Sequence, residues 1–316
     1  MPSRQLGRSI LRVSPLCFGG NVFGWTVDAD QSFTLLDAWL DAGFNFVDTA
    51  DVYSIWAPGH TGGESERIIG QWLRRSGRRQ DLVLATKVGK PMGPDQRGLK
   101  ADYIRKAVED SLQRLQTDYI DLYQSHDDDL DTPLEETLAA FDALHRAGKI
   151  RAIGASNYTA KRLAAALKVS ADHQWIRYES LQPLYNLYDR PAYEGELQDL
   201  CVNEGLGVIN FYTLAAGFLT GKYRSPQDAA KSARGKNTVA KYLNDRGLKI
   251  LRALDQVATM TGQTPAAIAT AWSIARPSVT APIVSATSLD QLEILVQAAR
   301  LRLDGECMAI LDAASA

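Results

Sequence analysis

Short apolar runs recur along the chain, and each is followed by a longer segment whose apolar residues repeat with helical spacing. Eight runs are expected to form strands: 15–18, 44–47, 82–86, 119–123, 150–154, 178–181, 206–211 and 281–285. Between the first two, Leu35, Leu36, Trp39 and Leu40 would share one face of a helix. Strands that alternate with helices predict a parallel sheet, because parallel neighbours need a crossover connection.

Eight strand–helix units in 316 residues favour an α/β fold of the closed (β/α)8 TIM barrel type, as one domain over residues 1–316. An open, doubly wound sheet is the alternative. Two segments fall outside the repeat. Residues 6–13 predict an N-terminal β-hairpin with a turn at Gly7 and Arg8, and residues 224–245 form a long polar loop after the seventh strand.

Local signals mark where helices begin and end. Gly43, Gly148 and Gly205 stand where a helix should end, because glycine adopts the left-handed conformation without a Cβ clash. Thr132 and Pro133 predict a helix start that Thr132 caps.

Composition excludes several classes of protein. The chain has 35 basic and 37 acidic residues, a net charge of −2, which argues against binding to nucleic acid or to an anionic membrane. Its apolar runs are too short to span a bilayer, and its start lacks a secretory signal. The three scattered cysteines form no disulfide framework or metal pair, so we expect a cytoplasmic protein. Oligomeric state is not predicted.

In a barrel of this kind, chemistry gathers at the C-terminal ends of the strands. The second strand is followed by Asp48 and Tyr53, the third by Lys87 and the fourth by His126. A buried lysine needs a carboxylate partner, and Asp48 is adjacent. The lysine should lower the pKa of Tyr53, which could then protonate a carbonyl oxygen to which His126 donates. The hydride must come from a cofactor.

The next strand ends offer groups that suit a nicotinamide. Ser156, Asn157 and Gln182 could bind its carboxamide, and Phe211 offers a flat face for its ring. Each candidate also has a structural interpretation. Asp48 and Lys87 could be a plain ion pair, and Tyr53 a packing aromatic. His126 could cap the local backbone, and Asn157 could cap the helix that begins at Tyr158 and Thr159.

Several motifs together make the chain similar to the aldo-keto reductases over nearly its full length. They are Phe46–Tyr53 with Gly63–Glu66, Ala85–Lys87, Tyr119–His126, Ile150–Asn157 and Leu214–Tyr223. The resemblance is strongest to the branch of bacterial members and potassium-channel β-subunits. It implies Asp48, Tyr53, Lys87 and His126 as a catalytic tetrad, with Tyr53 as proton donor, and an extended nicotinamide dinucleotide across the barrel mouth.

The resemblance also assigns binding residues. Those implied for the cofactor are Gly20, Asn21, Val22, Asp48, Ser156, Asn157, Gln182, Phe211, Tyr212, Leu214, Gly217, Lys222, Arg234, Ser285, Thr287 and Gln291. Those implied for a carbonyl or alcohol substrate are Trp25, Tyr53, Trp56 and His126.

The chain departs from the family pattern around the cofactor. Phe211 replaces Tyr or Trp, Thr213 replaces Pro, Ser285 replaces Gly and Thr287 replaces a basic residue, while Ile294 and Leu295 stand where Glu-Asn would contact adenine. NADP(H) is favoured because Lys222 and Arg234 can meet a phosphate, and NAD(H) remains possible.

The main hypothesis is therefore an NAD(P)H-dependent oxidoreductase that interconverts a carbonyl and an alcohol. A nicotinamide-binding regulatory subunit with slow turnover is the alternative. A hydrolase with Asp48 and Asp51 as a carboxylate pair is weaker, because it leaves Lys87 and Tyr53 without a role. Asp127–Asp129 is interpreted as a solvated acidic loop, and no metal site is predicted.

Overall fold

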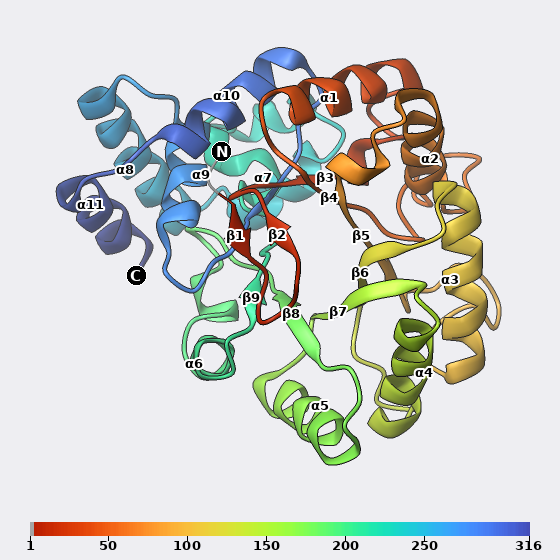
Figure 1. The fold of residues 1–316 in the computed structure, drawn as a ribbon. Coiled ribbons are helices and arrows are strands. Elements are labelled where there is room, and N and C mark those ends of the chain that lie inside the picture. The colour runs from red at the N-terminus through yellow and green to blue at the C-terminus, as the bar shows by residue number, and fades with distance from the viewer. Residues whose placement is uncertain (1–2) are drawn as a thin grey trace.

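The computed structural model describes residues 3–316, and an eight-stranded parallel sheet forms its centre (Figure 1). The strands are β3 Cys17–Gly19, β4 Phe46–Asp48, β5 Val83–Val88, β6 Ile120–Ser125, β7 Ile150–Ser156, β8 Tyr178–Gln182, β9 Gly207–Val208 and β10 Ile283–Val284. They lie in the order β10-β3-β4-β5-β6-β7-β8-β9.

The two ends of the sheet meet. The Thr280 N–H donates to the Val208 carbonyl at 2.8 Å, and the Ile283 N–H donates to the Asn210 carbonyl at 2.8 Å. These bonds link the edge formed by β9 to the edge formed by β10. The predicted (β/α)8 barrel is therefore confirmed against the open sheet.

Several strands run further than the apolar pattern predicts, and three of them by two residues. β5 continues through Lys87 to Val88, β6 to Ser125 and β7 to Ser156. The backbone ladder continues through polar residues because their side chains find partners. Lys87 Nζ bonds to Asp48, Ser125 Oγ to the Tyr178 hydroxyl, and Ser156 Oγ to the Gln182 carbonyl.

Helices surround the sheet (Figure 1). They are α1 Ala29–Asp41, α2 Glu64–Ser76, α3 Ala101–Leu115, α4 Leu134–Arg146, α5 Ala160–His173, α6 Glu196–Asn203, α7 Gly235–Tyr242, α8 Asp245–Thr261, α9 Pro265–Ala275, α10 Leu289–Arg300 and α11 Gly305–Ser315. The apolar face of α1 buries Leu35, Leu36, Trp39 and Leu40, as the helical spacing predicts. The helices thereby enclose the main hydrophobic core against the outside of the barrel.

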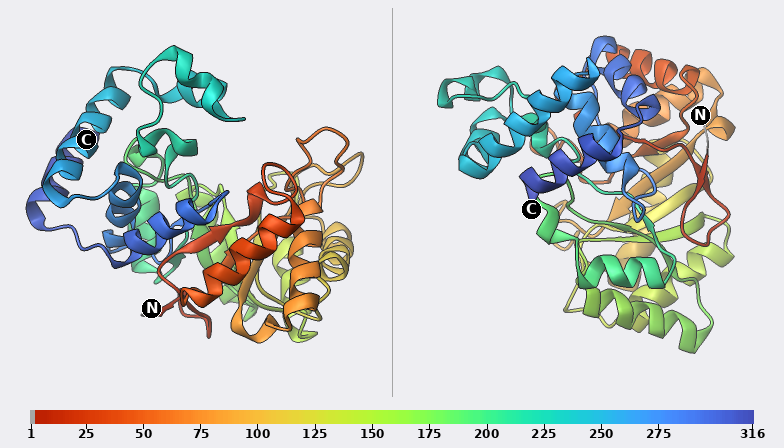
Figure 2. Two further views of the ribbon diagram at one scale, coloured as in Figure 1. Left: turned by 90° about the horizontal axis from the view of Figure 1, so that it is seen from above. Right: turned by 90° about the vertical axis from the view of Figure 1, so that its left-hand side faces the viewer.

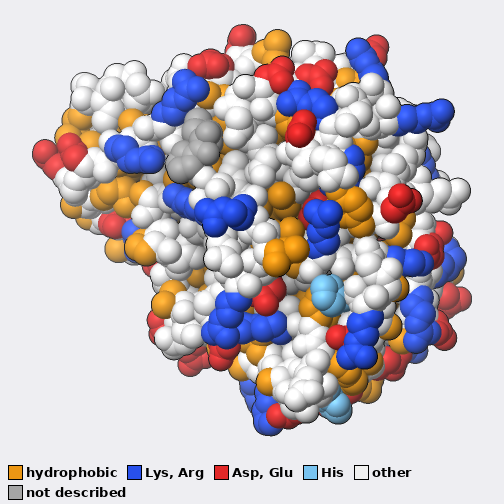
Figure 3. Space-filling model, in the orientation of Figure 1, with side chains coloured by type: hydrophobic (Ala, Val, Ile, Leu, Met, Phe, Trp, Pro, Cys, Tyr) orange, Lys and Arg blue, Asp and Glu red, His pale blue; other side chains and the backbone are white. Residues whose placement is uncertain are grey.

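The predicted N-terminal hairpin is present. Its strands are β1 Arg4–Gln5 and β2 Arg12–Val13, which pair antiparallel on either side of the turn at Gly7. Leu6 and Leu11 are buried in one cluster with inward-facing residues of the barrel strands, so the hairpin closes the end of the barrel at which the strands begin. Over the face that Figure 3 shows, basic and acidic side chains are interspersed.

The long segment after the seventh strand projects on the side opposite to the hairpin (Figure 2). It is not irregular throughout, because it contains a 3-10 turn at Pro226–Lys231 and the helix α7. Ser225 and Asp228 form a reciprocal capping box at the start of the turn. Arg234 directly precedes α7, so the 3-10 turn and this helix fix the position of its backbone.

Most of the expected helix boundaries agree with the structure. Gly43, Gly148 and Gly205 have φ values of 88°, 74° and 61°, in the left-handed region expected at a helix end. The expected cap at Thr132 is wrong. α4 begins with Pro133 as its flanking residue and no side-chain cap, because the Thr132 hydroxyl donates to Asp129 Oδ2 at 2.7 Å instead.

A close contact between α2 and α3 yields the first prediction. A Cβ atom on Gly70 would lie 2.1 Å from the Arg114 carbonyl oxygen, so Gly70→Ala should force the helices apart. We expect the free energy of unfolding to fall by about 1–3 kcal/mol in urea denaturation. Gly305→Ala is the control, because nothing lies within 4 Å of its added Cβ. Equal stability of the two variants would contradict the close packing.

Candidate active site

The predicted catalytic residues come together at the C-terminal ends of neighbouring strands. Asp48 ends β4, Lys87 lies near the end of β5, His126 follows β6, and Tyr53 lies in the turn after β4. Successive strand residues point to opposite faces, and Asp48 and Lys87 continue the inward rows that begin with the barrel-interior residues Phe46 and Ala85.

Lys87 is fully buried, and its ammonium group has an acceptor for each of its three N–H bonds. Nζ donates to Asp48 Oδ2 at 2.6 Å and to the Thr49 carbonyl at 2.8 Å. The third bond runs to the Tyr53 hydroxyl oxygen at 2.8 Å. Burial disfavours the charge on Lys87, but Asp48 and Tyr53 outweigh it, so the pKa of Lys87 is raised.

Asp48 is also fully buried, and its second oxygen is equally well occupied. Asp48 Oδ1 accepts from Gln124 Nε2 at 2.9 Å and from Gln182 Nε2 at 3.0 Å. Gln124 was not among the predicted site residues. The available signal was its place two residues after the barrel-interior residue Leu122, a spacing that puts both on the inner face of β6.

Tyr53 is partly exposed, and its hydroxyl lies 3.5 Å from Asp48 Oδ2. Burial at the strand ends raises the pKa of Tyr53 to about 12, and the charge on Lys87 offsets this effect only in part. The expected net lowering of the Tyr53 pKa is therefore wrong for this structure, because desolvation of the phenolate outweighs attraction to the ammonium group.

His126 lies beside Tyr53, with 5.9 Å between the ring centroids. Its side chain is buried, and its Nδ1 has no hydrogen-bond partner among residues 3–316. Burial, reinforced by the charges of Lys87 and Lys90, lowers the pKa of His126 well below its ordinary value. The imidazole is therefore neutral at pH 7 and has one N–H to donate.

The three residues expected at the nicotinamide carboxamide lie on adjacent strand ends. Ser156 Oγ donates to the Gln182 carbonyl at 2.9 Å, and Gln182 Nε2 is directed at Asp48. Asn157 is exposed and left-handed, and its Nδ2 donates to the His126 carbonyl and to Asp127 Oδ1. The structural interpretation of Asn157 as a helix cap is wrong, because the cap of α5 is Thr159, whose side chain accepts from the Arg162 N–H. Its contact with a ligand stays a prediction.

The segment after β9 brings further predicted residues to the mouth. Phe211 is half-buried beside the more exposed ring of Tyr212, with 5.3 Å between the ring centroids. Tyr212 and Gly217 have positive φ values of 57° and 91°, which turn the backbone sharply at the rim. Leu214 is half-buried, and Lys222 is exposed. A Cβ on Gly217 would lie 3.3 Å from Lys222 Nζ.

Arg234 reaches across the mouth to the segment after β3. Its guanidinium lies 4.9 Å from the centre of the Trp25 ring. With the Asn21 amide assigned so that its oxygen faces Arg234, the guanidinium donates to that oxygen, and the Asn21 nitrogen donates to Ser285 Oγ at 2.9 Å. Gly20 lies in the same turn. The side chain of Val22 instead packs in the hydrophobic core, so only its backbone could meet a ligand.

The remaining predicted cofactor residues lie before and on α10. Thr287 and Gln291 are exposed and bonded to each other, since Gln291 Oε1 accepts from the Thr287 N–H at 2.9 Å. Leu295 is buried in the core, so it faces away from any ligand at the surface.

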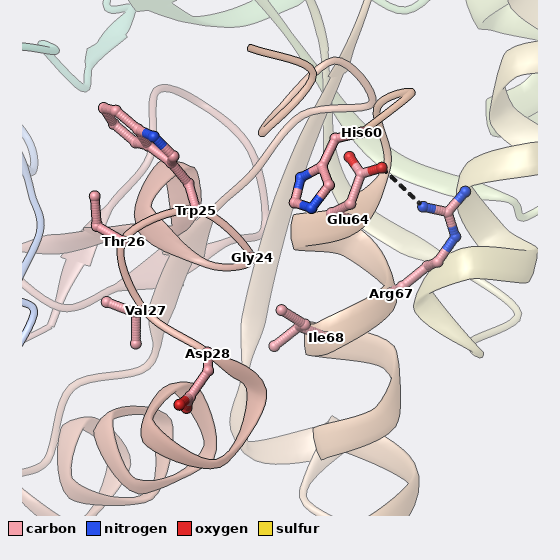
Figure 4. A pocket seen from close by; sticks show the side chains of 9 residues that line it. All are labelled: Gly24, Trp25, Thr26, Val27, Asp28, His60, Glu64, Arg67 and Ile68. Atoms are coloured by element: carbon pink, nitrogen blue, oxygen red, sulfur yellow. Dashed lines mark ion pairs between the residues drawn. The ribbon is translucent and has the colours of Figure 1, made fainter. Parts of the chain in front are cut away.

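Aromatic side chains form one wall of the mouth. Trp25 and Trp56 meet edge to face, with 5.6 Å between ring centroids, and Trp56 lies 6.0 Å from Tyr53. A pocket of about 620 Å³ lies next to this wall, with Trp25 on one side and His60 and Glu64 on the other (Figure 4). None of the four candidate catalytic residues lines that pocket.

The surroundings of Asp51 differ from those of Asp48. Asp51 is buried, and burial, with a further contribution from Glu66, raises its pKa well above the ordinary value. Its carboxyl has no hydrogen-bond partner among residues 3–316, whereas Asp48 is saturated with donors. That asymmetry does not favour the hydrolytic carboxylate pair.

The expectation that the acidic loop Asp127–Asp129 is simply solvated is wrong, because two of its carboxylates form ion pairs. Asp127 pairs with Lys90 at 3.0 Å, and Asp128 pairs with Arg162 at 2.9 Å. Across the described part of the chain, no cluster of three metal-binding side chains occurs. Within residues 3–316, no helix is long and apolar enough to cross a membrane.

Comparison with known proteins agrees with this geometry. A model of the aldo/keto reductase family matches residues 15–316. The chain belongs to the aldo/keto reductase family. The uncharacterised oxidoreductase YrpG of Bacillus subtilis (strain 168) is 37% identical over 99% of this chain and 95% of its own.

The names of two further relatives describe different functions. A probable voltage-gated potassium channel β-subunit of Oryza sativa subsp. japonica is 36% identical over 92% of this chain and 89% of its own. An L-glyceraldehyde 3-phosphate reductase of Escherichia coli O157:H7 is 33% identical over 94% and 87%, respectively. The resemblance that the motifs indicated is thereby confirmed.

In this aldo/keto reductase, two departures from the family pattern have a structural explanation. Thr213 Oγ1 donates to the Ile283 carbonyl at 2.7 Å, and Ser285 Oγ donates to the Gly19 carbonyl at 2.7 Å. Each hydroxyl joins a strand end to its neighbour, which no Pro or Gly side chain could do.

The buried neutral His126 predicts a pH dependence of stability. Its folded pKa lies below the unfolded value of about 6.5, so the unfolded chain binds the proton first. The contribution of His126 to the free energy of unfolding is therefore fully present above about pH 6.5, the unfolded pKa. It decreases as the pH falls from there toward the folded pKa. Between pH 7.5 and 5.5, the protein should lose about 1 kcal/mol more than His126→Asn in urea denaturation. Parallel losses would show that His126 is protonated in the folded state.

Proposed function

We propose that this aldo/keto reductase is an NAD(P)H-dependent oxidoreductase that reduces an aldehyde or ketone to an alcohol, or catalyses the reverse reaction. The observation that carries the proposal is the 2.8 Å hydrogen bond from Lys87 Nζ to the Tyr53 hydroxyl oxygen. Because that oxygen already accepts from Lys87, the Tyr53 proton is left to be donated, either toward Asp48 at 3.5 Å or to a substrate at the mouth.

The proposed proton transfer uses groups that are already in place. Tyr53 gives its proton to the carbonyl oxygen as the carbonyl carbon accepts a hydride, and the product is an alcohol. The phenolate that remains is stabilised by the ammonium group of Lys87, which Asp48 keeps charged. His126 donates its one N–H to the same substrate oxygen and thereby polarises the carbonyl bond. In the reverse direction, Tyr53 phenolate takes the proton back.

The strand ends and the long segment suit a nicotinamide dinucleotide. When bound, the cofactor supplies the hydride from C4 of its reduced nicotinamide ring. Ser156, Asn157 and Gln182 would hold the carboxamide, and Phe211 would lie against the ring. Lys222 and Arg234 are two cations near the mouth that could meet its phosphates, so we propose NADP(H) rather than NAD(H).

The aromatic wall supports a carbonyl substrate with an apolar or ring-bearing body. Trp25 and Trp56 lie next to Tyr53, and Trp56 is 45% exposed, so its surface is available to a ligand. The relative named L-glyceraldehyde 3-phosphate reductase supports an aldehyde as the reacting group. We also propose that residues 1–316 work as a single domain in the cytoplasm, where the three buried free cysteines would stay reduced.

A second function is favoured by the similarity to a potassium channel β-subunit. Such a protein would bind the cofactor, turn over slowly and act through a partner. Steady oxidation of NADPH in the presence of small aldehydes separates the two functions, because a regulatory subunit would show tight binding with little turnover.

Replacing Tyr53 tests the proton donor directly. Tyr53→Phe should lower kcat about 100-fold or more, because it removes the transferable proton but leaves the ring. The dissociation constant of the cofactor, followed by fluorescence titration, should change little. Tyr119→Phe is the matched control. Tyr119 directly precedes β6, and its hydroxyl contacts Gln80 and none of the proposed catalytic residues. Normal turnover by Tyr53→Phe would refute the assignment.

Arg234 is the proposed contact to a cofactor phosphate. Arg234→Met should raise the dissociation constant for NADPH about tenfold or more, because a hydrogen bond to a charged group is lost. A larger loss for NADPH than for NADH would place the contact at the 2′-phosphate, and an equal loss at the pyrophosphate. Lys236→Met, which alters an exposed cation on α7, is the control. Unchanged affinity in Arg234→Met would contradict the contact.

A further inference from the structure

A fully buried carboxamide lies below the proposed catalytic groups. Gln124 has no exposed surface and lies in the barrel interior, in register with Lys87 on β5 and with Gly154 on β7. Burying an amide without partners costs free energy, so a carboxamide in this position must find hydrogen bonds. A leucine or valine would fill the same space without that requirement.

Both ends of the Gln124 carboxamide are engaged. Its Nε2 donates to Asp48 Oδ1 at 2.9 Å, and its Oε1 accepts from Gln182 Nε2 at 3.2 Å. Gln182 Nε2 also donates to Asp48 Oδ1, at 3.0 Å. An ionised carboxylate only accepts hydrogen bonds, so Asp48 fixes which end of each amide faces it. The three side chains therefore form a closed triangle.

The backbone is shaped to make room for this triangle. A Cβ atom on Gly154 would lie 2.4 Å from Ser180 Oγ, 3.1 Å from Gln124 Cγ and 3.4 Å from its Oε1. Any larger residue at Gly154 would thus press on Gln124. Because Gly154 has no side chain, the long side chain of Gln124 on β6 fits beside β7.

We propose that Gln124 is a positioning residue that, together with Asp48, orients the Gln182 carboxamide for the cofactor. Because both acceptors of Gln182 Nε2, on Gln124 and Asp48, lie inside the barrel, Gln182 must present its Oε1 as the end left for a ligand. That oxygen can only accept, so it selects a nicotinamide whose carboxamide offers an N–H. The inference rests on the proposed function and extends it to a residue that touches neither cofactor nor substrate.

The test compares two oxidised cofactors by fluorescence titration of the full-length protein. One is NADP⁺, and the other is its analogue in which a methyl group replaces the NH₂ of the nicotinamide carboxamide. The unaltered protein should bind NADP⁺ about tenfold more tightly, because the analogue leaves Gln182 Oε1 unpaired. In Gln124→Met, which keeps length but not polarity, Gln182 Nε2 loses one of its two acceptors and is held by Asp48 alone. The Gln182 carboxamide is then oriented less firmly, so the preference should fall about threefold or more.

Two controls separate orientation from general damage. Tyr123→Phe changes the neighbouring residue of β6, whose hydroxyl has no partner in residues 3–316, and should keep the tenfold preference. Gln124→Asn, a shorter amide, should also lose the preference, and it covers the case in which Gln124→Met fails to fold. A preference that survives in folded Gln124 variants, or weaker binding of both dinucleotides by the same factor, would overturn the proposal.

Failure of the proposed function would look different. If the unaltered protein binds neither dinucleotide, the cofactor assignment and the orienting role both fall. The triangle itself is tested without a ligand by a double-mutant cycle of Gln124→Met and Gln182→Met in urea denaturation. Coupled side chains should make the unfolding equilibrium constants non-additive by about threefold or more. Additive effects would show that Gln124 does not hold Gln182.

Discussion

The buried ion pair between Lys87 and Asp48 constrains the rest of the site. Removing an ammonium group and a carboxylate from water costs several kcal/mol for each ion, and their mutual attraction offsets this only if the other hydrogen-bonding positions are filled. Here they are filled. Lys87 has three acceptors, and Asp48 receives Lys87 on one oxygen and two carboxamides on the other. The Tyr53 proton, Gln182 Oε1 and His126 Nδ1 keep unused hydrogen-bonding capacity, and all three belong to residues of the chemistry that we propose.

The barrel makes this arrangement possible because it brings distant residues to one level. Asp48, Lys87, Gln124 and Gln182 come from four strands, and no two of them are close in sequence. Each lies on an inward-facing row, above an apolar layer that the N-terminal hairpin closes from the other end. Water is thereby kept away from the ion pair from below, so its charges interact strongly.

Much of the fold could be predicted because its signals are local. Strand–helix alternation and the glycines at helix ends depend on neighbouring residues, and the strand-end placement of Asp48, Lys87 and His126 follows from the barrel. The sign of the Tyr53 pKa shift could not be predicted, because it is a balance between burial and the charge on Lys87 that only coordinates reveal. Thr132 was misassigned for a similar reason, since its hydroxyl bonds to Asp129. Gln124 was not predicted as a site residue, because a polar residue within an apolar strand is informative only when its partners are known.

The site divides into a fixed interior and an adaptable rim. Inside the barrel, Lys87 and Asp48 are partnered without any ligand, so the groups that we propose to transfer a proton are already in place. The rim consists of side chains from the long segment and the loops, where Arg234 rests on Trp25 and donates to Asn21. A phosphate bound by Arg234 would compete with that contact, because the guanidinium has a limited number of donors to share. With Arg234 as the cofactor contact that we propose, cofactor binding and the position of Trp25 would be coupled through this one side chain.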